Sequence, residues 1–277
     1  MSNRYKLLVV DIDGTLLDVN GVISDIDKQA LKTAVASGIT VSLSTGRVVQ
    51  AVRPFLDQLE LDGYHVFFDG ALVYNPEKDE EVYVDAIDTS LVAGMIDYAR
   101  QVSLDFDLYS KTQFFAEKST WATDIRRDFF KLDADFVDFR EILHRERFIK
   151  GTLVVASPEE KRKAREFCTF FEDRLHFSWT KTPAYPEVDF INIVARDVNK
   201  GKALRSLTSF LGITPDEVVA IGDGMNDIPL LNAAGLAIAM GNAPDEVKSV
   251  ADYVTLAVSR QGVSEAVRTC ILPGLSR

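Results

Sequence analysis

Two aspartates that follow a short apolar run are well placed in this sequence to do chemistry. Asp11 and Asp13 come directly after Leu7-Leu8-Val9-Val10 and are followed by Gly14-Thr15. Because side chains alternate along a strand, the two carboxylates project to the same side. Such a close pair either shares a cation or raises the pKa of one member. Taken alone, an Asp-x-Asp-Gly segment is better explained as a turn that leads into a solvated loop.

A second acidic pair lies near the other end of the chain, in Ile221-Gly222-Asp223-Gly224-Met225-Asn226-Asp227. The glycines allow a sharp turn that brings Asp223 and Asp227 over the end of an apolar strand. Carboxylate oxygens suit Mg²⁺, which keeps several waters and needs few protein ligands. By itself, this segment is also typical of a polar turn.

Two further segments have the residue types that bind an anion. Ser44-Thr45-Gly46-Arg47 lies between an apolar strand and a helix, where Thr45 can present its hydroxyl and backbone N–H groups to a phosphate. Ser and Thr are also common simply as N-caps. Asn199-Lys200-Gly201-Lys202 begins a helix, and Lys200 could supply the fixed positive charge that a transferring phosphoryl group requires. A surface lysine is the commoner explanation of any single Lys.

Alternating strands and helices are predicted to position these segments. The N-terminal part reads as a strand before Asp11, a helix over 25–37 and a strand over 39–43. The C-terminal part is predicted to form a helix over 200–211, a strand over 218–221, a helix from Pro229 and a strand over 236–239. Near-continuous apolar strands joined by helices predict one doubly wound parallel α/β sheet built from both ends of the chain. Ligands bind at the carboxyl ends of such strands.

The middle of the chain differs in kind from its ends. It contains both tryptophans and most of the aromatic residues, and alternating stretches such as 105–109 and 148–155 predict an antiparallel sheet with one solvated face. Helices over 120–131 and 158–171 are expected to cover the other face. We therefore predict an α+β domain inserted into the α/β core. The predicted segments are core residues 1–83, inserted residues 84–185 and core residues 186–277.

The overall composition excludes several classes of protein. A net charge of −11 argues against general affinity for nucleic acid, although a cation and a few fixed donors still allow one phosphate to bind. No apolar run has the length of a signal-peptide core or a bilayer span, so we expect no membrane association and a cytoplasmic location. Cys168 and Cys270 have no Cys or His at metal-ligand spacing, which argues against a disulfide or a zinc site.

In their order along the chain, the four segments resemble the four motifs of the haloacid dehalogenase (HAD) superfamily. Gly-Asp-Gly-Met-Asn-Asp looks like the Cof-type branch, subfamily IIB. Further matches to that branch are Thr45-Gly46-Arg47, Ala239-Met240-Gly241-Asn242-Ala243 and Gly262-Val263. The resemblance extends from Asp11 to about Val267, and the inserted segment matches the branch's cap in position and size. One departure is Asp69-Gly70-Ala71, where the branch usually has Asn-Gly-Ala.

This resemblance implies a Rossmann-like core with an inserted α+β cap and a Mg²⁺-dependent phosphatase acting on small phosphorylated metabolites, such as sugar phosphates. Asp11 is the implied nucleophile, which forms an aspartyl-phosphate, and Asp13 is the implied acid and base. The implied Mg²⁺ ligands are Asp11, the backbone carbonyl of Asp13, Asp223 and Asp227. The implied phosphate-binding residues are Thr45, Gly46, Lys200 and Asn226, and Arg47 is expected to contact the substrate.

Other functions stay open at this point. A phosphomutase or phosphotransferase would use the same aspartyl-phosphate and share every core residue. A non-catalytic binding protein is disfavoured, because the whole set of chemical residues is present. The physiological substrate, the cap residues that select it, the effect of Asp69, and the choice between monomer and homo-oligomer are not defined by the sequence.

Overall fold

The computed structural model of the chain describes residues 4–182 and 184–272, and the chain divides into two compact units. Unit 1 combines the residues up to Arg47, Arg53–Tyr83 and those from Asn199 onward. Unit 2 combines Val48–Val52 with Val84–Val198. It continues past the predicted boundary at 185, because the strand over Tyr185–Ala195 pairs with two other strands of unit 2. No helix in the described parts of the chain has the length and hydropathy needed to cross a lipid bilayer.

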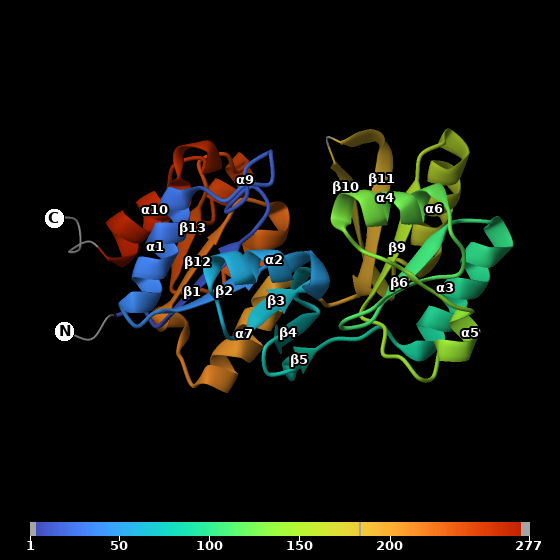
Figure 1. Cartoon of the computed structure of the whole chain (residues 1–277), viewed down its shortest axis with the longest axis horizontal. Helices are drawn as coiled ribbons and strands as arrows, with labels where there is room; N and C mark the ends of the chain where they lie inside the picture. Colours follow the sequence, from blue (N-terminus) through green and yellow to red (C-terminus); the bar gives the residue numbers. More distant parts are fainter. Residues whose placement is uncertain (1–3, 183, 273–277) are drawn as a thin grey trace. The chain divides into compact units, whose positions relative to one another are not determined.

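Unit 1 is built on an eight-stranded sheet with the order β14-β13-β12-β1-β2-β3-β4-β5 (Figure 1). Neighbouring strands from β14 to β3 are parallel, and β4 runs antiparallel to β3. Every residue of β1 and β12 is buried, as expected for strands covered on both faces. This parallel-dominated sheet confirms the predicted α/β core. The strands are β1 (Leu7–Asp11), β2 (Thr40–Ser44), β3 (His65–Phe67), β4 (Leu72–Asn75), β5 (Glu80–Val84), β12 (Val218–Gly222), β13 (Leu236–Ala239) and β14 (Tyr253–Val254).

Helices pack on this sheet through its alternating side chains. On one face, Leu204 and Leu207 of α7 share a hydrophobic cluster with Leu7 and Val9 of β1. Elsewhere α1 packs against β2 and α10. The α-helices are α1 (Asp25–Ala36), α2 (Val49–Leu59), α7 (Lys200–Leu211), α8 (Ile228–Leu231), α9 (Asp245–Lys248) and α10 (Gly262–Ala266). The shorter turns are η1 (Phe68–Gly70), η2 (Pro215–Glu217), η3 (Met225–Asp227), η4 (Val258–Arg260) and a π-helical turn, η5 (Val267–Ile271).

Unit 2 contains a six-stranded sheet with the order β10-β11-β9-β6-β7-β8. Neighbouring strands are antiparallel, except that β7 and β8 are parallel. This agrees with the antiparallel pairing expected from the alternating stretches. The strands are β6 (Phe106–Tyr109), β7 (Phe114–Ala116), β8 (Asp135–Phe136), β9 (Lys150–Val155), β10 (Leu175–Thr182) and β11 (Tyr185–Ala195).

Helices cover both faces of the unit 2 sheet, so the prediction of one solvated face is wrong. The two predicted helices exist as α4 (Trp121–Phe130) and α6 (Pro158–Phe171), and α3 (Thr89–Val102) and α5 (Phe139–Ile142) accompany them. Leu153 of β9 lies in the cluster that contains α3 and α6, whereas its neighbour Val154 packs with α4. Because adjacent strand residues point to opposite faces, α4 and α6 lie on opposite sides of the sheet.

Candidate active site

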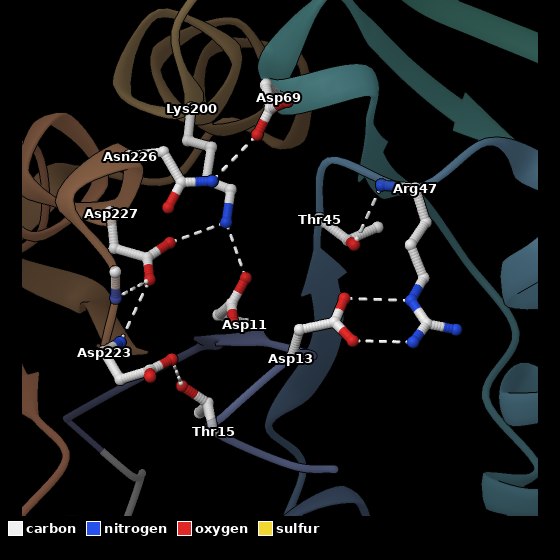
Figure 2. A network of polar contacts seen from close by, with 11 residues as sticks. Asp11, Asp13, Thr15, Thr45, Arg47, Asp69, Lys200, Asp223, Asn226 and Asp227 are labelled. Atoms are coloured by element: carbon white, nitrogen blue, oxygen red, sulfur yellow. Dashed lines mark hydrogen bonds and ion pairs between the residues drawn. The ribbon is translucent and has the colours of Figure 1, made fainter. Parts of the chain in front are cut away.

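A fully buried lysine joins the two ends of the chain. Lys200 is the first residue of α7, and the side chain of the preceding Asn199 caps this helix. Its Nζ donates to Oδ1 of Asp11 at 2.5 Å and to Oδ1 of Asp227 at 2.6 Å (Figure 2). Lys200 and Asp227 are completely buried and Asp11 is 5% exposed. The structure therefore brings together three of the predicted site residues, although Asp11 and Lys200 are 189 positions apart in the sequence.

The surroundings of this ion cluster change how its members ionise. Burial, followed by the nearby carboxylate of Asp227, raises the pKa of Asp11 well above its ordinary value, although Lys200 opposes the shift. Burial alone would lower the pKa of Lys200, but the charges of Asp11 and Asp227 overcome it and hold this pKa above its ordinary value. Lys200 is therefore a permanent ammonium at neutral pH.

The loop after β12 is shaped around Asp227. Oδ2 of Asp227 accepts hydrogen bonds from the backbone N–H groups of Asp223 at 3.0 Å and Gly224 at 2.9 Å. A Cβ atom at Gly222 would lie 2.6 Å from the Asp227 carboxylate, so only glycine fits at the end of the strand. Both Asp227 oxygens are thus engaged, one by the loop and one by Lys200.

Two residues that were not predicted as site residues hold Asp223. The Thr15 hydroxyl donates to Oδ1 of Asp223 at 2.9 Å, and Nδ2 of Asn242 donates to Oδ2 at 3.1 Å. Burial raises the pKa of Asp223 to about 6, against the lowering effect of the Thr15 hydrogen bond. In the sequence, Thr15 belongs to the Asp13-Gly14-Thr15 turn and Asn242 follows Gly241 after a predicted strand, but neither residue was predicted to have a role in the site.

Three carboxylates converge where a metal ion could bind. Asp11, Asp223 and Asp227 each place a carboxylate oxygen within 4.8 Å of the others. Burial and mutual repulsion raise the pKa of Asp11 and of Asp223, so the cluster is short of positive charge even beside Lys200. Hard oxygen donors in a partly buried, negatively charged cluster fit a divalent cation. These are the three predicted metal ligands that would bind through their carboxylates; the fourth is the backbone carbonyl of Asp13.

Asp13 turns its carboxylate toward Arg47. Nε of Arg47 donates to Oδ2 of Asp13 at 2.9 Å and Nη2 donates to Oδ1 at 2.6 Å, which is a bidentate pair (Figure 2). The Asp13 side chain is 55% exposed, unlike the buried Asp11. The predicted acid and base is thus half in solvent, and the predicted substrate contact, Arg47, is its ion-pair partner.

The loop after β2 carries the other predicted phosphate-binding residues. The Thr45 N–H donates to the Val66 carbonyl at 2.9 Å, so it is occupied by the sheet, and the Thr45 hydroxyl oxygen accepts the Arg47 N–H at 3.1 Å. A Cβ atom at Gly46 would lie 2.8 Å from both Asp69 carboxylate oxygens. Asn226, from the loop after β12, donates through Nδ2 to Oδ1 of Asp69 at 2.8 Å.

Comparison with known proteins matches this arrangement to one family. A sequence profile of haloacid dehalogenase-like hydrolases matches residues 8–267. The chain belongs to this haloacid dehalogenase-like hydrolase family. Among curated relatives of this hydrolase, the Bacillus subtilis 5-amino-6-(5-phospho-D-ribitylamino)uracil phosphatase YcsE is 30% identical over 271 residues, which cover 96% of each chain.

Solved structures agree with that assignment. The crystal structure of a haloacid dehalogenase-like hydrolase from Bacteroides thetaiotaomicron has a TM-score of 0.84 at 28% identity and covers 96% of this chain and 99% of that one. The subclass IIB sugar phosphatase BT4131 has a TM-score of 0.76 at 25% identity, with coverage of 95% and 98%. The predicted family, fold class and enzyme class, a phosphatase of the haloacid dehalogenase type, are thereby confirmed.

Proposed function

We propose that this enzyme is a Mg²⁺-dependent phosphatase that hydrolyses small phosphorylated metabolites, sugar phosphates or related phosphomonoesters, through an aspartyl-phosphate on Asp11. The observation that supports this most directly is the burial of Asp11 against the ammonium of Lys200, beside two further carboxylates. The phosphorylated small molecule named for YcsE and the sugar phosphates named for BT4131 support the same class of substrate.

Asp11 acts as the nucleophile in this proposal. Its Oδ1 is held by Lys200, which leaves Oδ2 to attack phosphorus as the bond to the leaving oxygen breaks. A carboxylate that approaches a phosphate dianion at about 4 Å faces several kcal/mol of repulsion at an effective dielectric near 20. Lys200 offsets part of that repulsion. Mg²⁺, held by Asp11, Asp223 and Asp227 and by the carbonyl of Asp13, supplies the remaining positive charge when bound.

Asp13 handles the protons in the proposed mechanism. It donates a proton to the leaving oxygen and then takes one from the water that hydrolyses the aspartyl-phosphate. Both Asp13 oxygens accept hydrogen bonds from Arg47 in the structure, so this ion pair must open before Asp13 carries the proton that it donates. The Thr45 hydroxyl, the Gly46 backbone, Lys200 and Asn226 hold the phosphoryl oxygens. Unit 2 is the cap domain in this proposal, because most of it is inserted in the sequence between the two larger parts of unit 1.

Phosphate release provides the test. We expect Mg²⁺-dependent release of phosphate from p-nitrophenyl phosphate and its loss in Asp11→Asn, which keeps the size of the side chain but removes the nucleophile. Turnover that persists after chelation of divalent metals, or in Asp11→Asn, would contradict the mechanism. Isomerisation of a hexose phosphate without net phosphate release would favour the phosphomutase alternative. A panel of phosphorylated metabolites assayed in the same way would then define the substrate.

A further inference from the structure

A strained turn holds the carboxylate of Asp69 beside the predicted phosphate-binding loop. Phe68 and Asp69 both adopt the left-handed conformation, with φ values of 53° and 57°. This costs roughly 1–2 kcal/mol for each residue that is not glycine, so surrounding contacts must enforce it. Phe68 is completely buried and its N–H donates to the Arg47 carbonyl at 3.2 Å, while the Asp69 N–H donates to the Thr45 carbonyl at 3.0 Å.

The next residue ties the same turn to the start of α7. Gly70 has φ of 104°, and a Cβ atom added there would lie 2.3 Å from the Asn199 carbonyl oxygen. The turn is therefore held between the loop after β2 and the helix that carries Lys200. Neither end leaves room for the backbone to relax, so the position of the Asp69 side chain is set by its surroundings.

Two residues predicted to hold the phosphoryl group lie beside that carboxylate. Asn226 donates a hydrogen bond to it at 2.8 Å (Figure 2). A Cβ atom at Gly46 would lie 2.8 Å from both of its oxygens. Asp69 thus places a negative charge within electrostatic reach of the proposed phosphate site.

A carboxylate in this place cannot itself bind a phosphate oxygen. An ionised carboxylate offers about four acceptor positions and no donor. The described contact with Asn226 occupies one of them, and the Asp69 side chain is only partly buried. A hydroxyl or an ammonium near the phosphoester would find an acceptor there, whereas a second anionic group would be repelled.

We propose that Asp69 is a specificity-determining residue, which favours leaving groups with a cationic or hydrogen-bond-donating group close to the phosphoester and disfavours those with a second anion there. The inference rests on the proposed phosphatase function and narrows its class of substrate. It concerns the first few atoms beyond the ester oxygen, because Asp69 lies beside the phosphate-binding residues of unit 1.

Three small phosphomonoesters of similar size test this charge preference. Phosphoethanolamine carries an ammonium, 2-hydroxyethyl phosphate a hydroxyl and phosphoglycolate a carboxylate at the same distance from the ester. Asp69→Asn removes the charge and keeps a side chain that tolerates the left-handed conformation. We expect the ratio of kcat/KM for phosphoethanolamine to that for phosphoglycolate to fall on the order of ten-fold in Asp69→Asn. Asp62→Asn, an exposed aspartate before β3, is the matched control and should not change the ratio.

Two further readouts separate charge selection from a merely structural role. The wild-type ratio should decrease as ionic strength rises, and the Asp69→Asn ratio should respond much less. An equal change of kcat/KM for all three esters would overturn the inference and leave Asp69 as a residue that only positions Asn226.

Equilibrium binding keeps this test separate from the test of the proposed function. The affinities of the same three esters for Asp11→Asn protein and for the Asp11→Asn/Asp69→Asn double variant, measured by calorimetry, should show the same loss of charge preference. If the wild-type protein hydrolyses none of the esters, the proposed function is wrong, but the binding measurements still test the charge preference attributed to Asp69. Unchanged relative affinities in the double variant would defeat the specificity inference alone.

Discussion

Replacing Lys200 by methionine removes the ammonium that Asp11 and Asp227 share and keeps a side chain of similar length. The two contacts measure 2.5 and 2.6 Å. At an effective dielectric near 20, each corresponds to about 6 kcal/mol before desolvation, and desolvation of the buried ions takes back several kcal/mol for each ion. Removing one partner of such a buried cluster costs about 3–5 kcal/mol of unfolding free energy.

The same substitution should also impair catalysis. Losing a fixed positive group at the reacting centre costs about 10²–10³ in kcat. Because Lys200 also holds the nucleophile, we expect kcat/KM for p-nitrophenyl phosphate to fall by at least about 10³-fold. The loss of stability should shrink between pH 7.5 and pH 5. The pKa of Asp11 is already raised by burial, and without the ammonium it rises further, so protonation at the lower pH relieves the repulsion.

Steady-state kinetics and urea unfolding at the two pH values check these expectations. Lys202→Met is a matched control, since it makes the same change two residues along the same helix, where the described cation contact is with the ring of Tyr83. The reasoning is refuted if Lys200→Met keeps kcat/KM within a few-fold of the wild type, or if its loss of unfolding free energy is the same at both pH values.

Three further predictions address the metal site and unit 2. Carboxylates bind Mg²⁺ only when deprotonated, and the pKa of Asp223 is raised to about 6. Mg²⁺ should therefore raise the melting temperature more at pH 7.5 than at pH 5.5. An equal rise at both pH values would argue against Asp223 as a ligand. Asn242→Ala removes a hydrogen bond to Asp223 and should increase the Mg²⁺ concentration for half-maximal activity about 10–100-fold, whereas an unchanged Mg²⁺ titration would contradict this. Arg126→Met leaves the buried Asp107, its ion-pair partner at 2.8 Å, without a counterion and should cost about 3–5 kcal/mol at pH 7.5. Burial raises the pKa of Asp107 to about 6, so the cost in unfolding free energy should be smaller at pH 5. Both tryptophans lie in unit 2, so their fluorescence reports this unfolding. A cost that does not depend on pH would count against the ion pair.

The parts of unit 1 that were predictable are those in which one local pattern determines one element. The helix predicted over 200–211 is α7, where apolar periodicity and the cap residue Asn199 agree. The strand predicted over 236–239 is β13, a short apolar run. The helix predicted from Pro229 is a single turn, α8. The chain turns back at Gly235, whose N–H donates to the carbonyls of Pro215, in the turn before β12, and of Val218, the first residue of β12.

Side-chain pairing between distant loops was not predictable from the sequence. The pairing of Arg47 with Asp13 depends on the rotamers of two side chains from separate loops. The resemblance placed both residues in the site but did not predict their ion pair. In unit 2, β9 and β11 are apolar on both faces. Leu153 of β9 and Ile191 of β11 belong to one cluster, whereas their neighbours Val154 and Phe190 belong to another. The sequences of these two strands do not alternate regularly between apolar and polar residues, so they did not show which face of the sheet each helix would cover.

The position of β12 in the sheet affects how the newly made protein folds. β12 lies between β1 and β13, so one edge of β1 has no partner until residues 218–222 have left the ribosome. Unit 2, which is almost continuous in sequence, is synthesised before that point. During this interval the nascent N-terminal strands expose an apolar, unpaired edge of the kind that promotes aggregation. The emerging chain also has Asp11 without its lysine, so the proposed activity can arise only after Lys200 has been synthesised.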